Sequence, residues 1–253
     1  ERIARLREMH YTDREARFLL LAALHSGVFV MRQYTAYAGI TFGAVTDQFV
    51  NKAATRRHIK PYPTRNRTLV YQVCKPVFIA IGEPDNRNRR MKQVGLTRLR
   101  LMGLDFVLRN QEHRYLATET EKLEYFTPLA GSTVSFPARV YTSNITGGQT
   151  TRFFVEKYPI YDRPPGTAIT FLDEDSITAF ESFLDRYMAL LCAIPQPEII
   201  FVTTNSAMIL NAQRPFLTKT SVQDSLIEFT TFEIDFRERA ALDTPTLATP
   251  EKA

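Results

Sequence analysis

Six polar side chains of the kinds that recognise DNA lie close together between residues 48 and 57. Gln and Asn can pair with adenine edges, and Lys and Arg can meet guanine edges or phosphates. The six residues are Gln48, Asn51, Lys52, Thr55, Arg56 and Arg57. The apolar residues among and before them recur at intervals of three and four, which predicts a helix with one buried stripe. That stripe would comprise Phe42, Val45, Phe49 and Ala53.

We predict that this helix runs from Phe42 to about Arg57 and that Thr41 caps it. The six polar side chains would then lie on its outward face or its flanks, where they could reach base edges in a major groove. Thr41 belongs to the same predicted DNA-binding set.

Two shorter helices are predicted before this one. Thr12 followed by Glu15 has the form of a capping box, in which each side chain bonds the other residue's backbone N–H. The apolar run 18–24 that follows predicts the first helix. Residues 28–38 predict the second helix, which Gly39 would end.

A basic hairpin is predicted after the three helices. Residues 59–62 and 68–73 are predicted strands, the second with the alternating pattern of a half-buried strand. Lys60, Arg65 and Arg67 would give the hairpin its positive charge and contact phosphates or a minor groove. Three helices followed by such a hairpin form the pattern of a winged helix-turn-helix, which is the fold predicted for this part.

Positive charge is concentrated in the first half of the chain. Residues 1–115 contain 21 Lys and Arg against 9 Asp and Glu, whereas residues 116–253 contain 11 against 18. A basic surface favours a polyanion partner, because phosphate contacts release counterions. The dense basic cluster near residue 90 adds Arg87, Arg89 and Arg90 to the predicted contacts. We therefore predict that double-stranded DNA binds the first half.

The second half alternates predicted strands and helices. Strands are predicted at 151–160, 168–172 and 198–204, and a helix at 177–194. A strand, a helix and a further strand in this order predict a small α/β domain. The predicted fold class of the whole chain is therefore α+β.

The turn-rich segment 129–135 is the predicted domain boundary. Residues 1–128 would form the winged helix-turn-helix domain with a helical extension, and residues 129–238 the α/β domain. Residues 239–253 are rich in Thr, Pro and Ala and predict a disordered tail. The acidic α/β domain would mediate self-association or bind another protein. A homodimer is an expected assembly, because one winged helix alone gives limited specificity.

Carboxylates near strand ends make a metal-dependent nuclease or nicking enzyme the alternative function for the α/β domain. A restriction-endonuclease-like core needs Glu-x-Lys, but Glu156 and Lys157 are adjacent and would point to opposite faces of a strand. The acidic cluster 173–175 begins a predicted helix, where carboxylates favour the helix dipole. No phosphate-binding glycine loop, nucleophile elbow or zinc-protease motif occurs. We expect a protein without enzymatic activity, catalytic residues, metal or cofactor; a protein-interaction adaptor is a further alternative.

Composition is that of an ordinary soluble protein. No apolar run approaches ~20 residues, so no membrane-spanning helix and no membrane partner are expected. The two cysteines, Cys74 and Cys192, are too few for a disulfide scaffold. Their number favours a reducing, cytoplasmic location.

Three features occur in order along residues 12–204. They are the basic winged helix, the apolar segment Leu104-Asp105-Phe106-Val107-Leu108, and the motif Tyr115-Leu116-Ala117-Thr118-Glu119-x-x-Lys122-x-x-Tyr125-Phe126. Together they resemble the replication-relaxation-like proteins of plasmids and integrative mobile elements. The resemblance implies a DNA-binding protein that acts in replication, conjugative transfer or transcription regulation of a mobile element. It supplies no catalytic residues for this chain. The second half of the chain lacks any complete nuclease signature.

Overall fold

The protein, described here by a computed structural model, has a mixed α+β fold. The described residues are 1–64, 68–90, 94–131, 134–142, 147–156, 158–172, 176–220 and 227–234, without the side chains of 94–96. They form two compact units, the first ending at Asn110 and the second beginning at Gln111. Within the described residues, no helix is long and apolar enough to span a membrane. The tail predicted at 239–253 lies outside the described residues.

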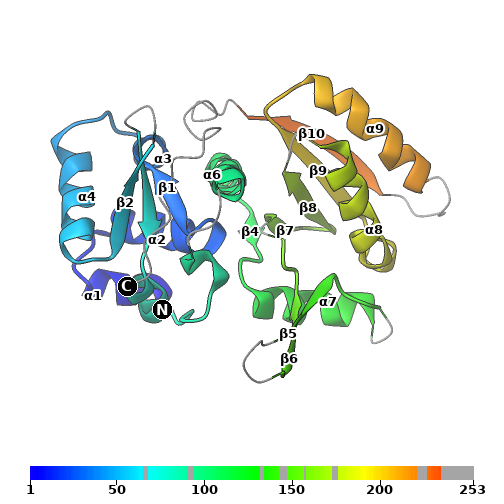
Figure 1. Ribbon diagram of the computed structural model, residues 1–253, viewed down its shortest axis with the longest axis horizontal. Coiled ribbons are helices and arrows are strands. Elements are labelled where there is room, and N and C mark those ends of the chain that lie inside the picture. The colour runs from blue at the N-terminus through cyan, green and yellow to red at the C-terminus, as the bar shows by residue number, and fades with distance from the viewer. Residues whose placement is uncertain are drawn as a thin grey trace. The chain divides into compact units, whose positions relative to one another are not determined.

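The first unit combines helices with a small antiparallel sheet (Figure 1). Its elements are α1 (Arg2–Glu8), α2 (Asp13–His25), β1 (Val28–Val30), α3 (Met31–Ala38), α4 (Ala44–Thr55), β2 (Ile59–Pro63), β3 (Leu69–Val73), α5 (Lys75–Ala80), the 3-10 helix η1 (Arg87–Arg89) and α6 (Val94–Arg109). The capping box of α2 is confirmed. The Oγ1 of Thr12 accepts from the backbone N–H of Glu15 at 3.3 Å, and the N–H of Thr12 donates to the Glu15 carboxylate at 2.8 Å.

The sheet of the first unit has the order β1-β3-β2. Strands β2 and β3 form the predicted hairpin, with Tyr62 opposite Val70. The prediction of one helix over 28–38 was wrong at its start, because residues 28–30 form β1 and Phe29 pairs with Tyr71. All three β1 residues are buried, and β-branched and aromatic side chains suit a buried strand.

Aromatic side chains fill the core of the first unit around Phe49 of α4. The Phe49 ring lies 4.3 Å from the ring of Tyr34, measured between centroids, and 6.1 to 6.2 Å from those of Phe18, Phe29 and Tyr11. These rings come from α2, α3, α4, β1 and the segment before α2. Phe49 therefore joins α4 to the rest of the unit.

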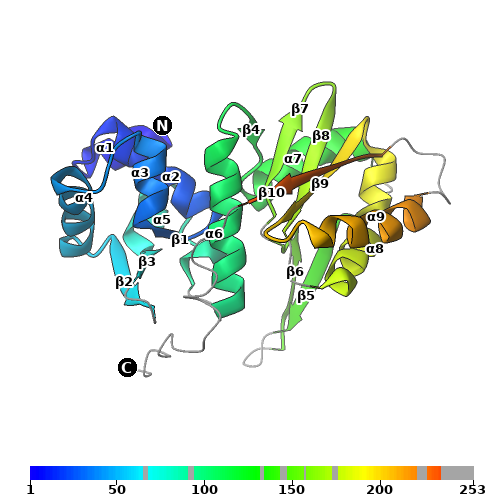
Figure 2. The ribbon, with the colours of Figure 1, turned by 90° about the horizontal axis from the view of Figure 1, so that it is seen from above.

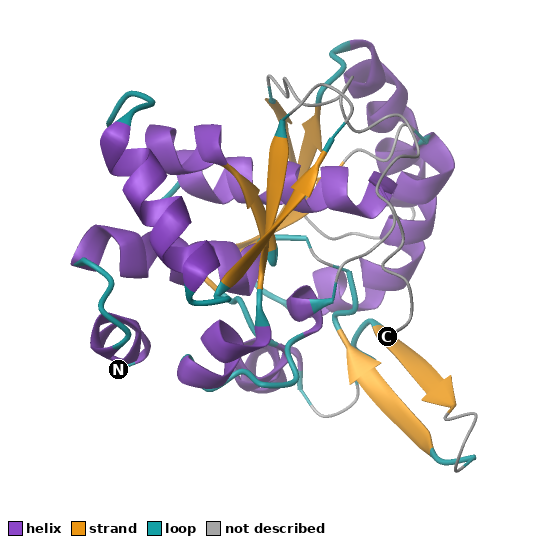
Figure 3. Ribbon diagram, turned by 60° about the vertical axis from the view of Figure 1, so that its left-hand side comes forward, coloured by secondary structure: helices purple, strands orange, loops and turns teal. Residues whose placement is uncertain are grey.

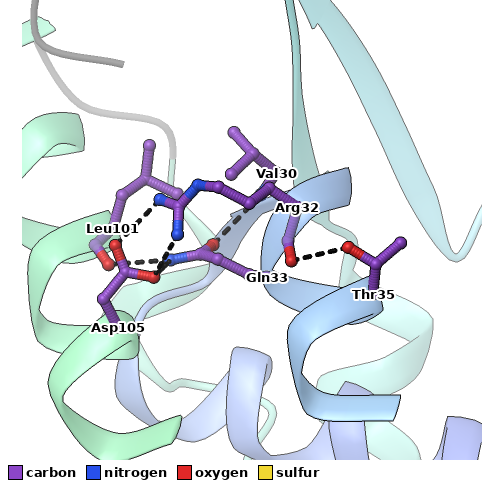
Figure 4. A network of polar contacts seen from close by, with 6 residues as sticks. All are labelled: Val30, Arg32, Gln33, Thr35, Leu101 and Asp105. Atoms are coloured by element: carbon purple, nitrogen blue, oxygen red, sulfur yellow. Dashed lines mark hydrogen bonds and ion pairs between the residues drawn. The ribbon is translucent and has the colours of Figure 1, made fainter. Parts of the chain in front are cut away.

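A buried polar network attaches α3 to α6 (Figure 4). The carboxylate of Asp105 accepts two hydrogen bonds from the Arg32 guanidinium, at 3.0 and 2.9 Å. The amide of Gln33 donates to Asp105 at 3.0 Å and to the carbonyl of Leu101 at 2.8 Å. Its amide oxygen accepts from the backbone of Val30 at 3.1 Å. The paired charges and the amide thus satisfy one another inside the unit.

The second unit is built on a five-stranded sheet of order β10-β9-β8-β7-β4. Its elements are β4 (Arg114–Tyr115), α7 (Glu119–Ala130), β5 (Ala138–Thr142), β6 (Gln149–Phe153), β7 (Ile160–Arg163), β8 (Gly166–Leu172), α8 (Ile177–Ala193), β9 (Pro197–Thr203), α9 (Ala207–Thr220) and β10 (Glu228–Glu233). Strands β8, β9 and β10 are parallel and are joined by α8 and α9. These two helices lie side by side on one face of the sheet (Figure 2).

Phenylalanines hold these helices to the sheet. The ring of Phe180 in α8 lies 5.0 Å from both Phe171 of β8 and Phe201 of β9. The ring of Phe216 in α9 stacks on Phe229 of β10 at 4.6 Å. The strands predicted at 168–172 and 198–204 and the helix predicted at 177–194 are confirmed, with small differences at their ends.

Two predictions for the second half were wrong. The strand predicted at 151–160 is interrupted, because Phe154 adopts a left-handed backbone with φ of 47° and β6 ends before it. The boundary predicted within 129–135 falls too late, because Tyr115 of β4 pairs with Tyr161 of β7. Tyr125 of α7 also hydrogen-bonds Thr167 of β8 at 2.9 Å. Both contacts join segments far apart in the chain, so β4 and α7 belong to the second unit.

Candidate nucleic-acid interface

Helix α4 has one buried and one exposed face. Its buried residues are Thr46, Phe49, Val50 and Ala53. They follow the spacing of one helix face. On the opposite face Ala44, Asp47, Gln48, Asn51 and Thr55 are exposed, so one carboxylate lies among these side chains. Among the described residues, no hydrogen bond engages the side chains of Gln48, Asn51 or Thr55. Their donors and acceptors are therefore available to a ligand.

The predicted start of this helix was wrong. Gly43, not Thr41, is the N-cap, and the hydroxyl of Thr46 bonds the N–H and the carbonyl of Gly43 at 3.1 and 2.7 Å. The helix begins two residues later than predicted, so Phe42 precedes it. Phe42 is 66% exposed and Val45 is 50% exposed, whereas both were predicted to be buried. Thr41 is exposed as well.

Lys52 is not presented as a free cation. Its ammonium lies 2.5 Å from the Glu15 carboxylate and 5.1 Å from the centroid of the Tyr11 ring. These contacts tie α4 to the start of α2. Lys52 stays a predicted DNA contact, and in the structure its charge is paired with the carboxylate of the buried Glu15.

Two exposed arginines and a neutral histidine follow the end of α4. Arg56 donates to the carbonyl of Met9, and Arg57 has a left-handed backbone with φ of 56°. Burial, and next the charge of Arg56, lower the pKa of His58. The hydroxyl of Tyr11 hydrogen-bonds the Nδ1 of His58 at 2.8 Å. The positive charge here therefore comes from the arginines at neutral pH.

The hairpin adds a further exposed cation. Lys60 of β2 lies opposite Gln72 of β3, and its ammonium is 5.2 Å from the centroid of the Tyr62 ring. Arg65 and Arg67 lie outside the described residues. Residues 48–82, which cover most of α4 and the whole hairpin, contain seven Lys and Arg and no Asp or Glu.

The basic cluster 87–90 is anchored by the side-chain amide of Asn88 and by the backbone carbonyl of Arg89. The buried amide of Asn88 donates to two carbonyls at the end of α2, at 3.2 and 2.6 Å. The backbone carbonyl of Arg89 accepts from the side-chain amide of Gln72 at 2.6 Å. The Arg89 guanidinium lies 3.8 Å from the carboxylate of Asp85. Arg87 is half-buried and Arg90 is exposed. Of these three arginines, Arg90 is the one most accessible to a phosphate.

The carboxylates considered for a nuclease are engaged by cations or hydroxyls. Glu156 is paired with Arg186, and Asp162 accepts from Tyr125 at 3.1 Å and lies 3.7 Å from Arg114. Within the part of the chain that the structure describes, no three His, Cys, Asp or Glu residues are placed to hold a metal. Lys157 and the cluster 173–175 lie outside that part.

Lys122 of α7 is a buried cation that sequence reasoning did not single out as a site. Its ammonium is 5.8 Å from the centroid of the Phe154 ring. Burial lowers the pKa of Lys122 to about 8, and nearby Glu156, Glu121 and Glu119 oppose that shift. The sequence around position 122 gives no sign that this lysine is buried, and charged side chains are exposed in most folded proteins.

We expect the second unit to gain stability as the pH rises from 7 to 9.5. The folded state releases the Lys122 proton near pH 8 while the unfolded chain still holds it, so raising the pH favours folding by on the order of 2 kcal/mol. Above pH 10 the buried tyrosines act in the opposite direction, because burial raises the pKa of Tyr187. Lys122→Met should remove the rise, measured by urea unfolding across this range. The more exposed Lys219→Met should retain it, and parallel profiles for wild type and Lys122→Met would contradict the assignment.

Comparison of the chain with protein-family models, with curated proteins and with solved structures found no match.

Proposed function

We propose that the first unit is a winged helix-turn-helix that binds double-stranded DNA, with α4 in the major groove. The observation that carries the proposal is the exposed face of α4, where Gln48, Asn51 and Thr55 have no partners among the described residues. Two of the three can pair with adenine edges. Phosphate contacts would come from Arg57 and Lys60, which flank that face in sequence and are exposed.

The arrangement of the elements supports this proposal. Helices α2, α3 and α4 precede the hairpin β2–β3, and β1 completes the sheet. The aromatic core fixes α4 from its inner side, so its outer side is presented on a rigid element. A rigid element positions recognition groups more reproducibly than a loop. Apart from Asp47 in the first turn of α4, residues 44–82 contain no carboxylate and seven Lys and Arg, a balance that favours a polyanionic ligand.

We expect Gln48→Ala/Asn51→Ala to weaken binding to a preferred duplex by roughly 10- to 100-fold, because a bidentate base contact contributes ~1–3 kcal/mol. The duplex would be selected from a random library with the wild-type protein, and affinity measured by fluorescence anisotropy at a fixed salt concentration. Stability should change little, because both side chains are exposed.

Asn211→Ala/Gln213→Ala is the matched control, since it removes the same two side-chain types from an exposed part of α9. It should leave DNA affinity unchanged. A Gln48/Asn51 variant that binds the selected duplex as tightly as wild type would reject α4 as the reading element.

Exposed Phe42 and Val45 favour a second candidate function, a protein-interaction adaptor. Large exposed apolar side chains beside a polar face are typical of protein interfaces. An adaptor would show no salt-dependent affinity for DNA, whereas a DNA-binding protein loses affinity steeply as salt is added. The same titration therefore separates the two functions.

The proposed biological setting is the cytoplasm, in replication, transfer or transcription regulation of a mobile element. This setting is supported by the resemblance of residues 104–126 to replication-relaxation-like proteins and by the difference in charge between the two halves of the chain. The acidic second half would serve self-association or the binding of another protein. A homodimer would extend the DNA sequence that is read, since two half-sites bind two copies.

A further inference from the structure

A two-stranded ribbon, β5–β6, projects from the body of the second unit (Figure 3, lower right). Every residue of β5 is exposed, and so is every residue of β6 except the half-buried Phe153. The strands are antiparallel, with Arg139 opposite Arg152 and Tyr141 opposite Thr150. These four side chains share one face, because opposite residues in a ladder point to the same side and alternate residues do too.

This ribbon differs in charge from the unit that carries it. Residues 116–253 contain 18 Asp and Glu against 11 Lys and Arg, yet residues 125–155 contain no Asp or Glu at all. Their two cations, Arg139 and Arg152, face each other directly across the strands. Like charges at opposite positions destabilise a strand pair. An anion bound between them would remove that cost.

The carboxylates near the two arginines hold them only weakly. Arg139 lies 3.8 Å from Glu156, and Arg152 lies 3.6 Å from Glu119, distances longer than a hydrogen bond. Glu156 is already paired with Arg186, and Glu119 accepts from the backbone N–H of Phe153 at 3.0 Å. The side chains of Arg139 and Arg152 are 58% and 45% exposed. The carboxylates are less exposed, at 10% for Glu156 and 29% for Glu119, but each has another partner, so a phosphate can replace them at the two arginines.

We propose that the face of β5–β6 bearing Arg139, Tyr141, Thr150 and Arg152 is a second binding site for double-stranded DNA. A two-stranded ribbon fits the major groove, and arginine forks bind phosphate oxygens at its edges. Tyr141 and Thr150 supply hydroxyls for further phosphate or base contacts. The identity of the ligand at this site rests on the proposed function. The site adds to that function a second DNA contact, made by the acidic half of the chain.

A second copy of the chain suits this face poorly. A symmetric contact places the same patch against itself, so the arginines of one copy would meet those of the other. The two carboxylates near that face, Glu156 and Glu119, already have other partners and would not neutralise the arginines of a second copy. DNA is therefore the occupant that its charge favours, and self-association is an outcome that the experiment must detect.

The first test is the salt dependence of binding to a random-sequence duplex by the full chain. Arg139→Ala/Arg152→Ala should weaken binding at low salt by roughly tenfold and reduce the slope of log K against log salt by about 2, because each phosphate contact contributes about 0.9. Arg214→Ala/Lys219→Ala, which removes the same charge from α9, should leave both quantities unchanged.

A third variant, Arg57→Ala/Lys60→Ala, separates a failure of the ribbon site from a failure of the proposed function. If that variant loses affinity and the ribbon variant matches the α9 control, the ribbon site is rejected while the proposed function stands. If the ribbon variant alone loses affinity, the proposed role of the α4 and hairpin cations is rejected and the ribbon site stands. Wild type without any affinity rejects both. A ribbon variant that changes sedimentation but not DNA affinity rejects the site in favour of self-association.

Photo-crosslinking tests which face binds. Val140 and Tyr141 are adjacent in β5, both are exposed, and they lie on opposite faces of the ribbon. A benzophenone amino acid at position 141 should crosslink to DNA at least severalfold more than the same group at position 140. Equal crosslinking at the two positions, or more at 140, would overturn the proposal.

Discussion

Asp105→Ala should lower the free energy of unfolding of the first unit by about 3 kcal/mol, since breaking a buried ion pair from one side costs ~3–5 kcal/mol. The Asp105 carboxylate is buried and accepts from Arg32 and Gln33 (Figure 4). Alanine would leave the Arg32 guanidinium without this partner while only a quarter of its side chain is exposed. That exposure places the expected loss at the lower end of the range. Urea unfolding of wild type and variant measures it.

One further variant at this site separates charge from packing, and a variant at an exposed ion pair of α2 is the control. Asp105→Asn keeps an acceptor for Gln33 but loses the charge opposite Arg32, so its loss should be intermediate. Asp13→Ala breaks a pair with Arg17 in which both side chains are more than half exposed. That change should cost under about 0.5 kcal/mol. Equal losses for Asp105→Ala and Asp13→Ala would show that the network of α3 and α6 does not stabilise the unit.

Signals confined to neighbouring residues predicted much of the fold. The capping box at Thr12 requires only residues three apart, and it is present in the structure. The buried strand β9 is a nearly continuous run of β-branched and aromatic residues, which local sequence shows directly. The polar face of α4 follows from helical spacing and is exposed as predicted at Gln48 and Asn51.

Features that depend on distant partners were missed. β1 has three residues, and its strand form is stabilised by pairing with β3, about forty residues later. Lys52 belongs to the predicted recognition set by spacing, but Glu15 of α2 binds it in the folded chain. Such pairings depend on tertiary structure, which overrides local propensity.

The start of α4 shows how a small capping choice changes a predicted site. The predicted start at Phe42 follows the apolar spacing, but the Thr46 hydroxyl bonds Gly43 and the helix begins at Ala44 instead. Phe42 then lies outside the helix and is exposed. Only part of the ribbon β5–β6 falls in a predicted strand, that at 151–160, and apolar Val140 and Tyr141 suggest a burial that the second unit does not provide. Its lack of carboxylates was visible in the sequence, and its projection was not.

Phe49→Ala should lower the free energy of unfolding of the first unit by roughly 3 to 5 kcal/mol, the usual cost of removing a buried phenylalanine ring. Phe49 is fully buried and contacts four aromatic rings, so alanine would leave a cavity that these rings cannot readily fill. Urea unfolding measures the loss. Hydrogen exchange should show it as faster exchange in α2, α3 and α4, because Phe49 joins them.

Asn51→Ala is the control on the same helix, because it lies two residues further on and on the exposed face. It should change stability by under about 0.5 kcal/mol, since surface substitutions away from special features usually do. If Phe49 supports α4 and Asn51 reads a ligand, the first variant loses stability and the second loses DNA affinity. Asn51→Ala as destabilising as Phe49→Ala would contradict the division of α4 into an inner face that packs and an outer face that binds.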